Sequence, residues 1–203
     1  LQLLETTQMT DEQVEYAALA SQSTEHLLKV INDILDFSRI ERAPFELEHI
    51  AFNLADLISS CAQAFAHSAV QRGLKLQLQL PDGMQALHVQ GDPTRIRQIL
   101  VNLIGNALKF TERGQVTIEP QWQSLDHELL WFTCTVRDSG IGIGAEHLAR
   151  MFDAFAQADN SISRRYGGTG LGLPIARTLA ERMGGTLSAQ SEVGSGSVFT
   201  LEI

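Results

Sequence analysis

Residues 92–111, DPTRIRQILVNLIGNALKFT, carry the most informative pattern in the chain. Asp92 followed by Pro93 is typical of a helix start, because the carboxylate accepts hydrogen bonds from free amides and proline fits the first turn. Apolar residues recur at helical spacing and form the expected buried stripe: Ile96, Ile99, Leu100, Leu103 and Ala107. Three amide side chains repeat every fourth position on another face: Gln98, Asn102 and Asn106. The sequence therefore predicts an amphipathic helix with a column of amides on one side.

This column of amides can hold a metal ion and a polyphosphate together. An asparagine carbonyl is a neutral oxygen ligand that suits Mg²⁺, and its amide hydrogens reach phosphate oxygens. Lys109, one turn further along, adds positive charge. Two asparagines on a helix are more often solvated or capping groups, so this interpretation depends on the other motifs.

Two glycine-rich segments supply those motifs. Residues 138–144, DSGIGIG, follow an apolar strand, and the Asp138 carboxylate can accept a hydrogen bond from an exocyclic amine such as that of adenine. Residues 166–173, YGGTGLGL, open a predicted helix whose unpaired first amides attract anions. Each segment alone also fits an ordinary turn.

The polar segment 156–165 between them lacks apolar periodicity. We expect a mobile flap that closes over a nucleotide, with Arg164 and Arg165 near the phosphates. Phe152 and Phe155 are expected to pack the hinge of the flap against the core. An ordinary surface loop is the alternative.

A long amphipathic helix is predicted near the start of the chain. Residues 12–41 contain neither Gly nor Pro, and an apolar stripe recurs at helical spacing: Leu27, Leu28, Ile31, Ile34 and Leu35. Together with the preceding Leu1 to Glu5 segment it resembles part of a helical hairpin, which would pair with a second chain. A core helix of the main domain is the alternative. Pro44 marks the expected boundary between residues 1–42 and a compact domain of residues 43–203.

The compact domain is predicted to combine helices with a mixed or antiparallel sheet in two layers, an α+β fold. The expected strands lie near residue 51, at 74–80, 116–122 and 129–137, with two more at the end of the chain. The expected helices lie at 54–71, 92–110, 146–152 and 171–183.

Composition excludes several functions. A net charge of −9 and a pI near 5.1 argue against a nucleic-acid partner. No apolar run approaches the roughly 20 residues needed to cross a bilayer, and we expect no membrane contact by these residues. Cys61 and Cys134 are expected to be buried thiols in a reducing, cytoplasmic compartment.

Five segments occur in the order and spacing of one protein family: NLIGNALKFT, DSGIGI, MFDAFAQAD, GGTGLGL and GSGSVF. Together they resemble the catalytic domain of sensor histidine kinases, and FAQADNSISRRYGGTGLGL is most similar to the bacterial hybrid type. The resemblance implies the Bergerat-type α/β sandwich shared with gyrase, Hsp90 and MutL. It also identifies ILDFSRIE, residues 34–41, with the end of the second helix of the dimerisation and phosphoacceptor hairpin.

The resemblance implies a site for ATP and Mg²⁺. Asn106 would be the metal ligand, with Asn102 near the phosphates, and Asn106, Lys109 and Arg165 would act in catalysis. Asp138 would recognise the adenine amino group. Further positions would line the base pocket, anchor the flap or surround the triphosphate: Gly140, Gly142, Ile143, Phe152, Phe155, Gly168, Thr169, Gly170, Leu171 and Gly172.

Two departures from related families limit the chemistry. Gln98 stands where hydrolytic relatives carry a glutamate, which favours phosphoryl transfer to a protein group over hydrolysis. None of the six histidines has the His-Glu-x-Arg-Thr-Pro context of the family's acceptor, so we expect that histidine upstream of Leu1.

The expected function is a protein histidine kinase of a phosphorelay, a homodimer that passes phosphate to a receiver domain. The alternatives are a regulatory pseudokinase acting through its hairpin and a hydrolytic ATPase. The full protein is expected to be a membrane-anchored sensor with this portion in the cytoplasm.

Overall fold

The computed structural model describes residue 7 and residues 9–42, 46–125, 129–156 and 169–203. A five-stranded sheet has the order β2-β4-β5-β7-β6. Its strands are β2 (Lys75–Leu78), β4 (Gln115–Ser124), β5 (Leu130–Asp138), β6 (Thr186–Glu192) and β7 (Gly196–Glu202). Only β2 and β4 run parallel, and the other neighbours are antiparallel. The mixed sheet confirms the α+β prediction.

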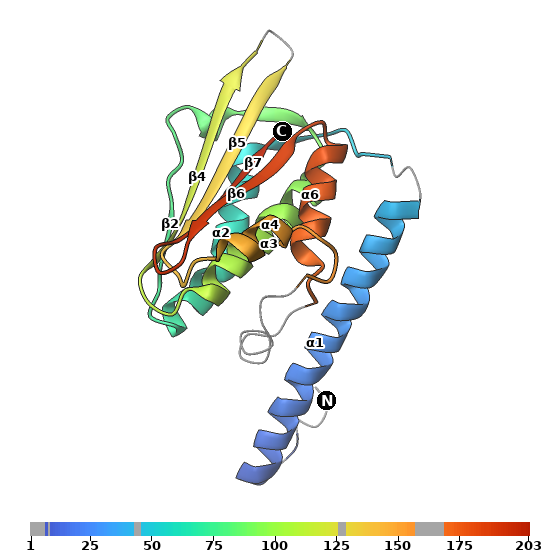
Figure 1. Ribbon diagram of the computed structural model, residues 1–203, viewed down its shortest axis with the longest axis vertical. Coiled ribbons are helices and arrows are strands. Elements are labelled where there is room, and N and C mark those ends of the chain that lie inside the picture. Colours follow the sequence, from blue (N-terminus) through green and yellow to red (C-terminus); the bar gives the residue numbers. More distant parts are fainter. Residues whose placement is uncertain (1–6, 8, 43–45, 126–128, 157–168) are drawn as a thin grey trace.

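Helices cover one face of this sheet (Figure 1). They are α2 (Leu54–Gln71), α3 (Pro93–Phe110), the short α4 (Ala145–Arg150) and α6 (Gly172–Arg182). α3 is the central helix, since it contacts α2 on one side and α6 on the other. Asp92 caps α3 as expected, and its Oδ1 accepts from the Arg95 amide at 2.9 Å. The predicted stripe of α3 is buried, which confirms the helical periodicity.

The alternation of apolar residues in the strands decides which face of the sheet is covered. Val116 and Ile118 of β4 and Cys134 and Val136 of β5 are fully buried against the helices. Their neighbours on the opposite face are mostly polar, as expected for a sheet covered on one side. Cys61 and Cys134 are free, buried thiols, which confirms that prediction. Burial raises the pKa of Cys134 to about 12.

A second, two-stranded sheet was not expected. β1 (Ile50–Asn53) pairs antiparallel with β3 (His88–Gly91). The sequence HVQG of β3 is too short for a clear periodicity, and it follows the 3₁₀ turn η2 (Met84–Ala86). The predicted short helix also ends earlier than expected, at Arg150 instead of residue 152.

The N-terminal helix α1 (Asp11–Arg42) is 32 residues long and runs beside α6 (Figure 1). Its predicted apolar stripe stays 44–58% exposed, so the domain does not cover it. This exposure disagrees with the alternative of a plain core helix. Among the described residues, no helix is long and apolar enough to cross a membrane.

Candidate nucleotide-binding site

One large cavity of about 1000 Å³ lies among α3, α4, α6 and the end of the sheet. It brings together most of the side chains and glycines that the sequence analysis singled out. Its lining includes Asn102, Asn106, Lys109, Asp138, Gly142, Ile143, Phe155, Thr169, Gly170 and Gly172. Residues 92–111, 138–144 and 169–173 therefore meet at one place although they are far apart in the sequence.

The amide column of α3 forms one wall of the cavity. The Asn106 side-chain nitrogen donates to the Asn102 oxygen at 3.2 Å, which fixes the two amides relative to each other. This hydrogen bond uses the Asn106 nitrogen and not its oxygen, and Asn106 lines the cavity. A neutral oxygen of this kind fits Mg²⁺, which takes most of its remaining ligands from phosphates and water. Lys109 lines the same cavity, with its Nζ 4.9 Å from the centre of the Phe110 ring.

Asp138 lies at the end of β5 and is only 6% exposed. Burial raises the pKa of its carboxyl group, and hydrogen bonds from the Gly140 amide and from Ser197 partly offset this effect. The Gly140 amide donates to Oδ1 at 2.8 Å. A carboxylate held in this way at a cavity wall can recognise a single donor of a ligand.

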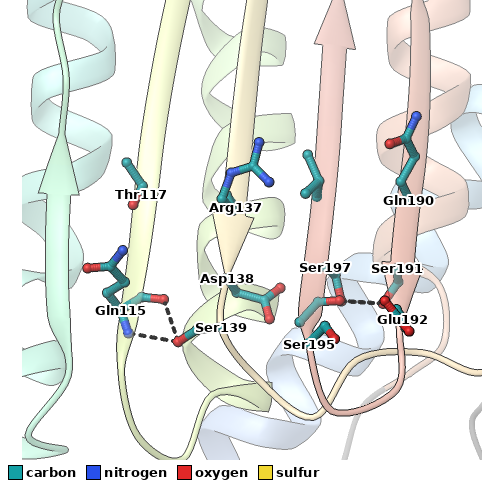
Figure 2. Close-up of a pocket in the computed structure, with 12 residues that line it drawn as sticks. Gln115, Thr117, Arg137, Asp138, Ser139, Gln190, Ser191, Glu192, Ser195 and Ser197 are labelled. Atoms are coloured by element: carbon teal, nitrogen blue, oxygen red, sulfur yellow. Dashed lines mark hydrogen bonds between the residues drawn. The ribbon is translucent and has the colours of Figure 1, made fainter.

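The close-up in Figure 2 shows Asp138 and Ser197 on neighbouring strands. They also border a smaller pocket of about 430 Å³ at the ends of β4, β5, β7 and β6. Ser139 joins this edge, because its hydroxyl accepts from the Gln115 amide at 2.9 Å. Of the predicted phosphate-binding residues that the structure describes, none lines the smaller pocket, so the larger cavity is the candidate site.

The glycines near the cavity have different structural roles. Gly142 has a φ of +68°, and an added Cβ would lie 2.0 Å from the Glu192 carbonyl oxygen, so the fold itself requires glycine there. A Cβ on Gly172 would lie 2.5 Å from the Asn102 oxygen. Gly140 does not line the cavity but orients Asp138, and Leu171 is buried in the core at 1% exposure.

The start of α6 faces the cavity without a side-chain cap. Its first turn leaves amides unpaired, and the helix dipole adds a positive field there. Thr169 precedes this turn, and its hydroxyl accepts from the Leu171 amide at 3.2 Å. The arrangement suits an anion, as the glycine pattern suggested. Arg164, Arg165 and Gly168, which the sequence placed near the phosphates, lie outside the described residues.

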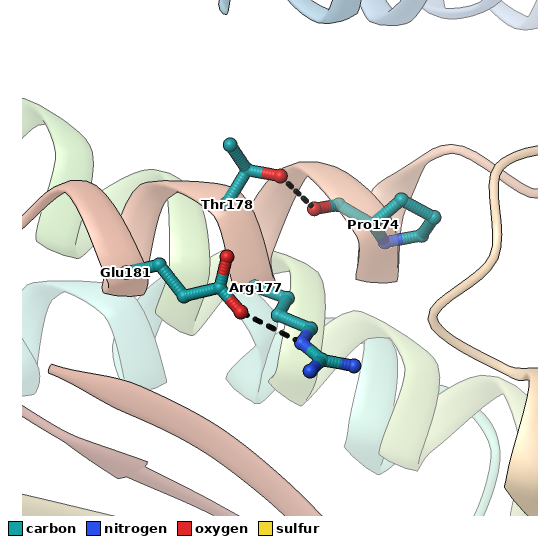
Figure 3. A network of polar contacts seen from close by, with 4 residues as sticks. All are labelled: Pro174, Arg177, Thr178 and Glu181. Carbon is teal, nitrogen blue, oxygen red and sulfur yellow. Dashed lines mark hydrogen bonds and ion pairs between the residues drawn. The ribbon is translucent and has the colours of Figure 1, made fainter.

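The two phenylalanines expected at the flap hinge differ. Phe152 packs against the core, with the Arg177 guanidinium 5.1 Å from its ring centre. Arg177 also donates to Glu181 at 2.9 Å, which holds it along α6 (Figure 3). The expectation for Phe155 was wrong, because it is 63% exposed and makes an edge contact with Phe37 of α1 at 6.2 Å. Periodicity could not reveal this contact, since it joins distant segments.

Sequence reasoning missed several residues of the cavity. Phe65 and Ser68 reach it from α2, and Arg72 reaches it from the C-cap of that helix. His147 and Arg150 reach it from α4. Arg72 donates to the Leu108 carbonyl at 3.1 Å. These residues belong to no glycine-rich or amide motif, so the sequence offered no signal for them. Val30 and Asp33 of α1 also line the cavity.

A two-layer sandwich with an amide-lined helix and a buried aspartate defines a class of nucleotide-binding domains. The sequence model of the histidine kinase-, DNA gyrase B- and HSP90-like ATPases matches residues 91–203, and the chain belongs to this family. The curated relatives that it resembles are sensor histidine kinases. The signal transduction histidine-protein kinase BarA of Escherichia coli is 41% identical over 97% of the chain, and the sensor protein GacS of Pseudomonas syringae is 40% identical over 99%. The chain spans 21% and 22% of their lengths.

Solved structures agree with this family. Full-length ShkA in complex with AMPPNP has a TM-score of 0.78 and 34% identity, covering 98% of this chain and 40% of that one. The histidine kinase ThkA in complex with the response regulator protein TrrA has a TM-score of 0.70 and 26% identity, covering 97% and 52%. Both similarities extend over α1 as well as the sheet and its helices.

Proposed function

We propose that this chain binds ATP with Mg²⁺ and transfers the γ-phosphoryl group to a histidine of the dimerisation hairpin. The observation that carries the proposal is the single cavity in which the α3 amides, the buried Asp138 and the uncapped start of α6 meet. Asp138 would accept the adenine amino hydrogen, Gly142 and Ile143 would line the base, and Gly170 and Gly172 would admit the phosphates. Gly140 and Leu171 would contribute indirectly, by shaping the wall of the cavity. Arg165 and Gly168 are also proposed to contact the phosphates.

Asn106 would hold Mg²⁺, and Asn102 and Lys109 would contact the phosphates. When bound, the metal supplies charge neutralisation between the phosphates. The residues of the chain would then orient the γ-phosphorus for in-line attack. An imidazole nitrogen of the hairpin forms the new P–N bond, the bond to the β-phosphate oxygen breaks, and ADP leaves. None of the histidines in residues 1–203 has the acceptor context, so the acceptor belongs to a preceding helix in this proposal.

The surroundings of Gln98 support transfer over hydrolysis. Arg95 donates to the Gln98 oxygen at 2.9 Å, and the Gln98 nitrogen donates to Asp36 of α1 at 2.8 Å. Both ends of the amide are therefore engaged. The residue at position 98 is itself an amide and not a carboxylate, so it cannot take a proton from a water molecule as the glutamate of hydrolytic relatives would.

We further propose that residues 1–42 belong to the hairpin and residues 43–203 to the catalytic domain. The exposed stripe on α1 supports a homodimer through this hairpin in the full protein, because apolar side chains of this kind usually face a partner. A receiver domain, in the same chain or in a response regulator, would accept the phosphoryl group. The site would act in the cytoplasm, in a protein anchored in the membrane.

A titration of this chain with Mg-ATP tests binding. We expect Asn106→Ala to weaken Mg-ATP binding about tenfold or more and to leave binding of metal-free adenosine nearly unchanged, because it removes a metal ligand. Leu27→Ala on the exposed face of α1 is the matched control. A chain that ignores adenine nucleotides would reject the proposal.

Phosphoryl transfer is tested with a longer protein that contains the preceding helix. Incubation with γ-labelled ATP should give acid-labile phosphohistidine in the parent and not in Asn106→Ala. A parent that binds nucleotide but takes up no label would favour a regulatory pseudokinase that acts through its hairpin. Phosphate release without any acceptor would favour a hydrolytic ATPase.

A further inference from the structure

The helix α1 reaches the rim of the nucleotide cavity through residues 30–37, and its polar and aromatic contacts there come from residues 33–37. The Thr169 hydroxyl donates to the Asp33 carboxylate at 2.8 Å. One turn along, Asp36 accepts from Gln98 at 2.8 Å, and the Phe37 ring meets Phe155. Each of these contacts joins α1 to a part of the cavity wall that comes from a different segment of the chain.

Asp33 differs from Asp36 and Phe37 because its side chain lines the cavity itself. Its partner Thr169 lies two residues before Leu171, the N-cap of α6, which has no side-chain cap. A hydroxyl has a single hydrogen to donate, so Thr169 can serve either the Asp33 carboxylate or a phosphate oxygen, but not both. The positive field at the start of α6 attracts either anion in the same way.

We infer that Asp33 occupies the place of a phosphate oxygen, and that docking of α1 and binding of the nucleotide polyphosphate oppose each other. This inference rests on the proposed ATP site and concerns how that site is regulated. With α1 docked, a triphosphate has to displace the Asp33 carboxylate from Thr169 and overcome its negative charge. The contacts of Asp36 and Phe37 make that displacement more difficult, because they hold the same segment in place.

Linkage makes the effect reciprocal. If docked α1 lowers the affinity for ATP by some factor, bound ATP weakens the docking of α1 by the same factor. A nucleotide lacking phosphates meets no such competition. Filling the cavity with a triphosphate would therefore release the segment of α1 that precedes the catalytic domain, and a signal that moves α1 would change the affinity for ATP.

Calorimetric titration of the chain with Mg-ATP and, separately, with adenosine tests the inference. Asp33→Asn removes the charge and keeps the shape of the side chain. We expect it to tighten Mg-ATP binding about fivefold or more, at the lower end of the range for coupled sites, and to leave adenosine binding unchanged. Asp36→Asn lies outside the cavity lining and should act in the same direction with a smaller effect.

Asp11→Asn is the matched control, since it removes the same charge from the first turn of the same helix. It should change neither affinity. Unchanged or weaker Mg-ATP binding by Asp33→Asn overturns the inference, and weaker binding would make Asp33 part of the nucleotide site. An equal gain for ATP and adenosine also overturns it, because the competition would then not lie at the phosphates. If no variant and no parent binds ATP, the proposed function fails first and the inference fails with it.

Discussion

Replacing Asp138 by asparagine isolates the recognition of the purine. The Asp138 carboxylate has about four acceptor positions, and the hydrogen bonds from Gly140 and Ser197 use most of them. The remaining acceptor position of the carboxylate can accept one hydrogen from a ligand. A hydrogen bond to a charged group is worth about 1.5–3 kcal/mol, so Asp138→Asn should weaken ATP binding by roughly 10- to 150-fold.

Inosine triphosphate provides the matched comparison. It carries an oxygen in place of the 6-amino group of ATP, so the parent should bind it more weakly. The asparagine amide can present a donor to that oxygen, so the preference of the variant for ATP should narrow or disappear. Titration of both proteins with both nucleotides measures the four affinities. If Asp138→Asn binds ATP as tightly as the parent, Asp138 does not recognise the base and the proposed orientation of the nucleotide is wrong.

Asp138→Asn should also change how the free energy of unfolding depends on pH. Burial raises the pKa of Asp138 in the folded chain, so the folded state holds this proton more tightly than the unfolded state. Its contribution to stability is therefore greatest at low pH and is lost as the pH rises through the raised pKa. Urea unfolding at several pH values should show this decline in the parent, and the decline should be smaller in Asp138→Asn.

Two further substitutions test packing around the site. Gly172→Ala would place its Cβ 2.5 Å from the Asn102 oxygen, so we expect weaker Mg-ATP binding and a loss of stability of about 1–3 kcal/mol. The comparison is Gly184→Ala, whose Cβ meets nothing within 4 Å. That variant measures the cost of backbone strain at a φ of +81° alone. Leu103→Ala should lower the free energy of unfolding by about 2–5 kcal/mol, because Leu103 is fully buried in α3. Thermal unfolding with and without Mg-ATP measures both, and a stable Leu103→Ala would contradict the central position of α3.

The sequence predicted the elements whose patterns are local. The stripe and cap of α3, the positions of β4 and β5, and the apolar stripe of α1 each follow from signals within one segment. The amide column and Asp138 were found because amides, carboxylates and glycines stand out at fixed spacing. Their meeting in one cavity followed from the family resemblance, since no pattern within a segment encodes it.

What the sequence could not predict depends on contacts between distant segments. β3 exists because it pairs with β1, about 40 residues earlier by the register Ile50 to Gly91. Phe155 makes a ring contact with Phe37 instead of packing against the core, and Thr169 donates a hydrogen bond to Asp33, 136 positions away. Phe65 of α2 and Arg72 at its C-cap line the cavity without belonging to a motif. Such partners are set by how the helices pack together.

The burial of the two native cysteines has a practical consequence. Cys134 is fully enclosed, with its pKa raised to about 12, and burial also raises the pKa of Cys61. Thiolates are the reactive form, so both sulfurs remain protonated and inaccessible near neutral pH. A cysteine introduced on the exposed side of α1 would then be the only position to take a maleimide dye or spin label. The movement of that helix could be followed in the otherwise native chain.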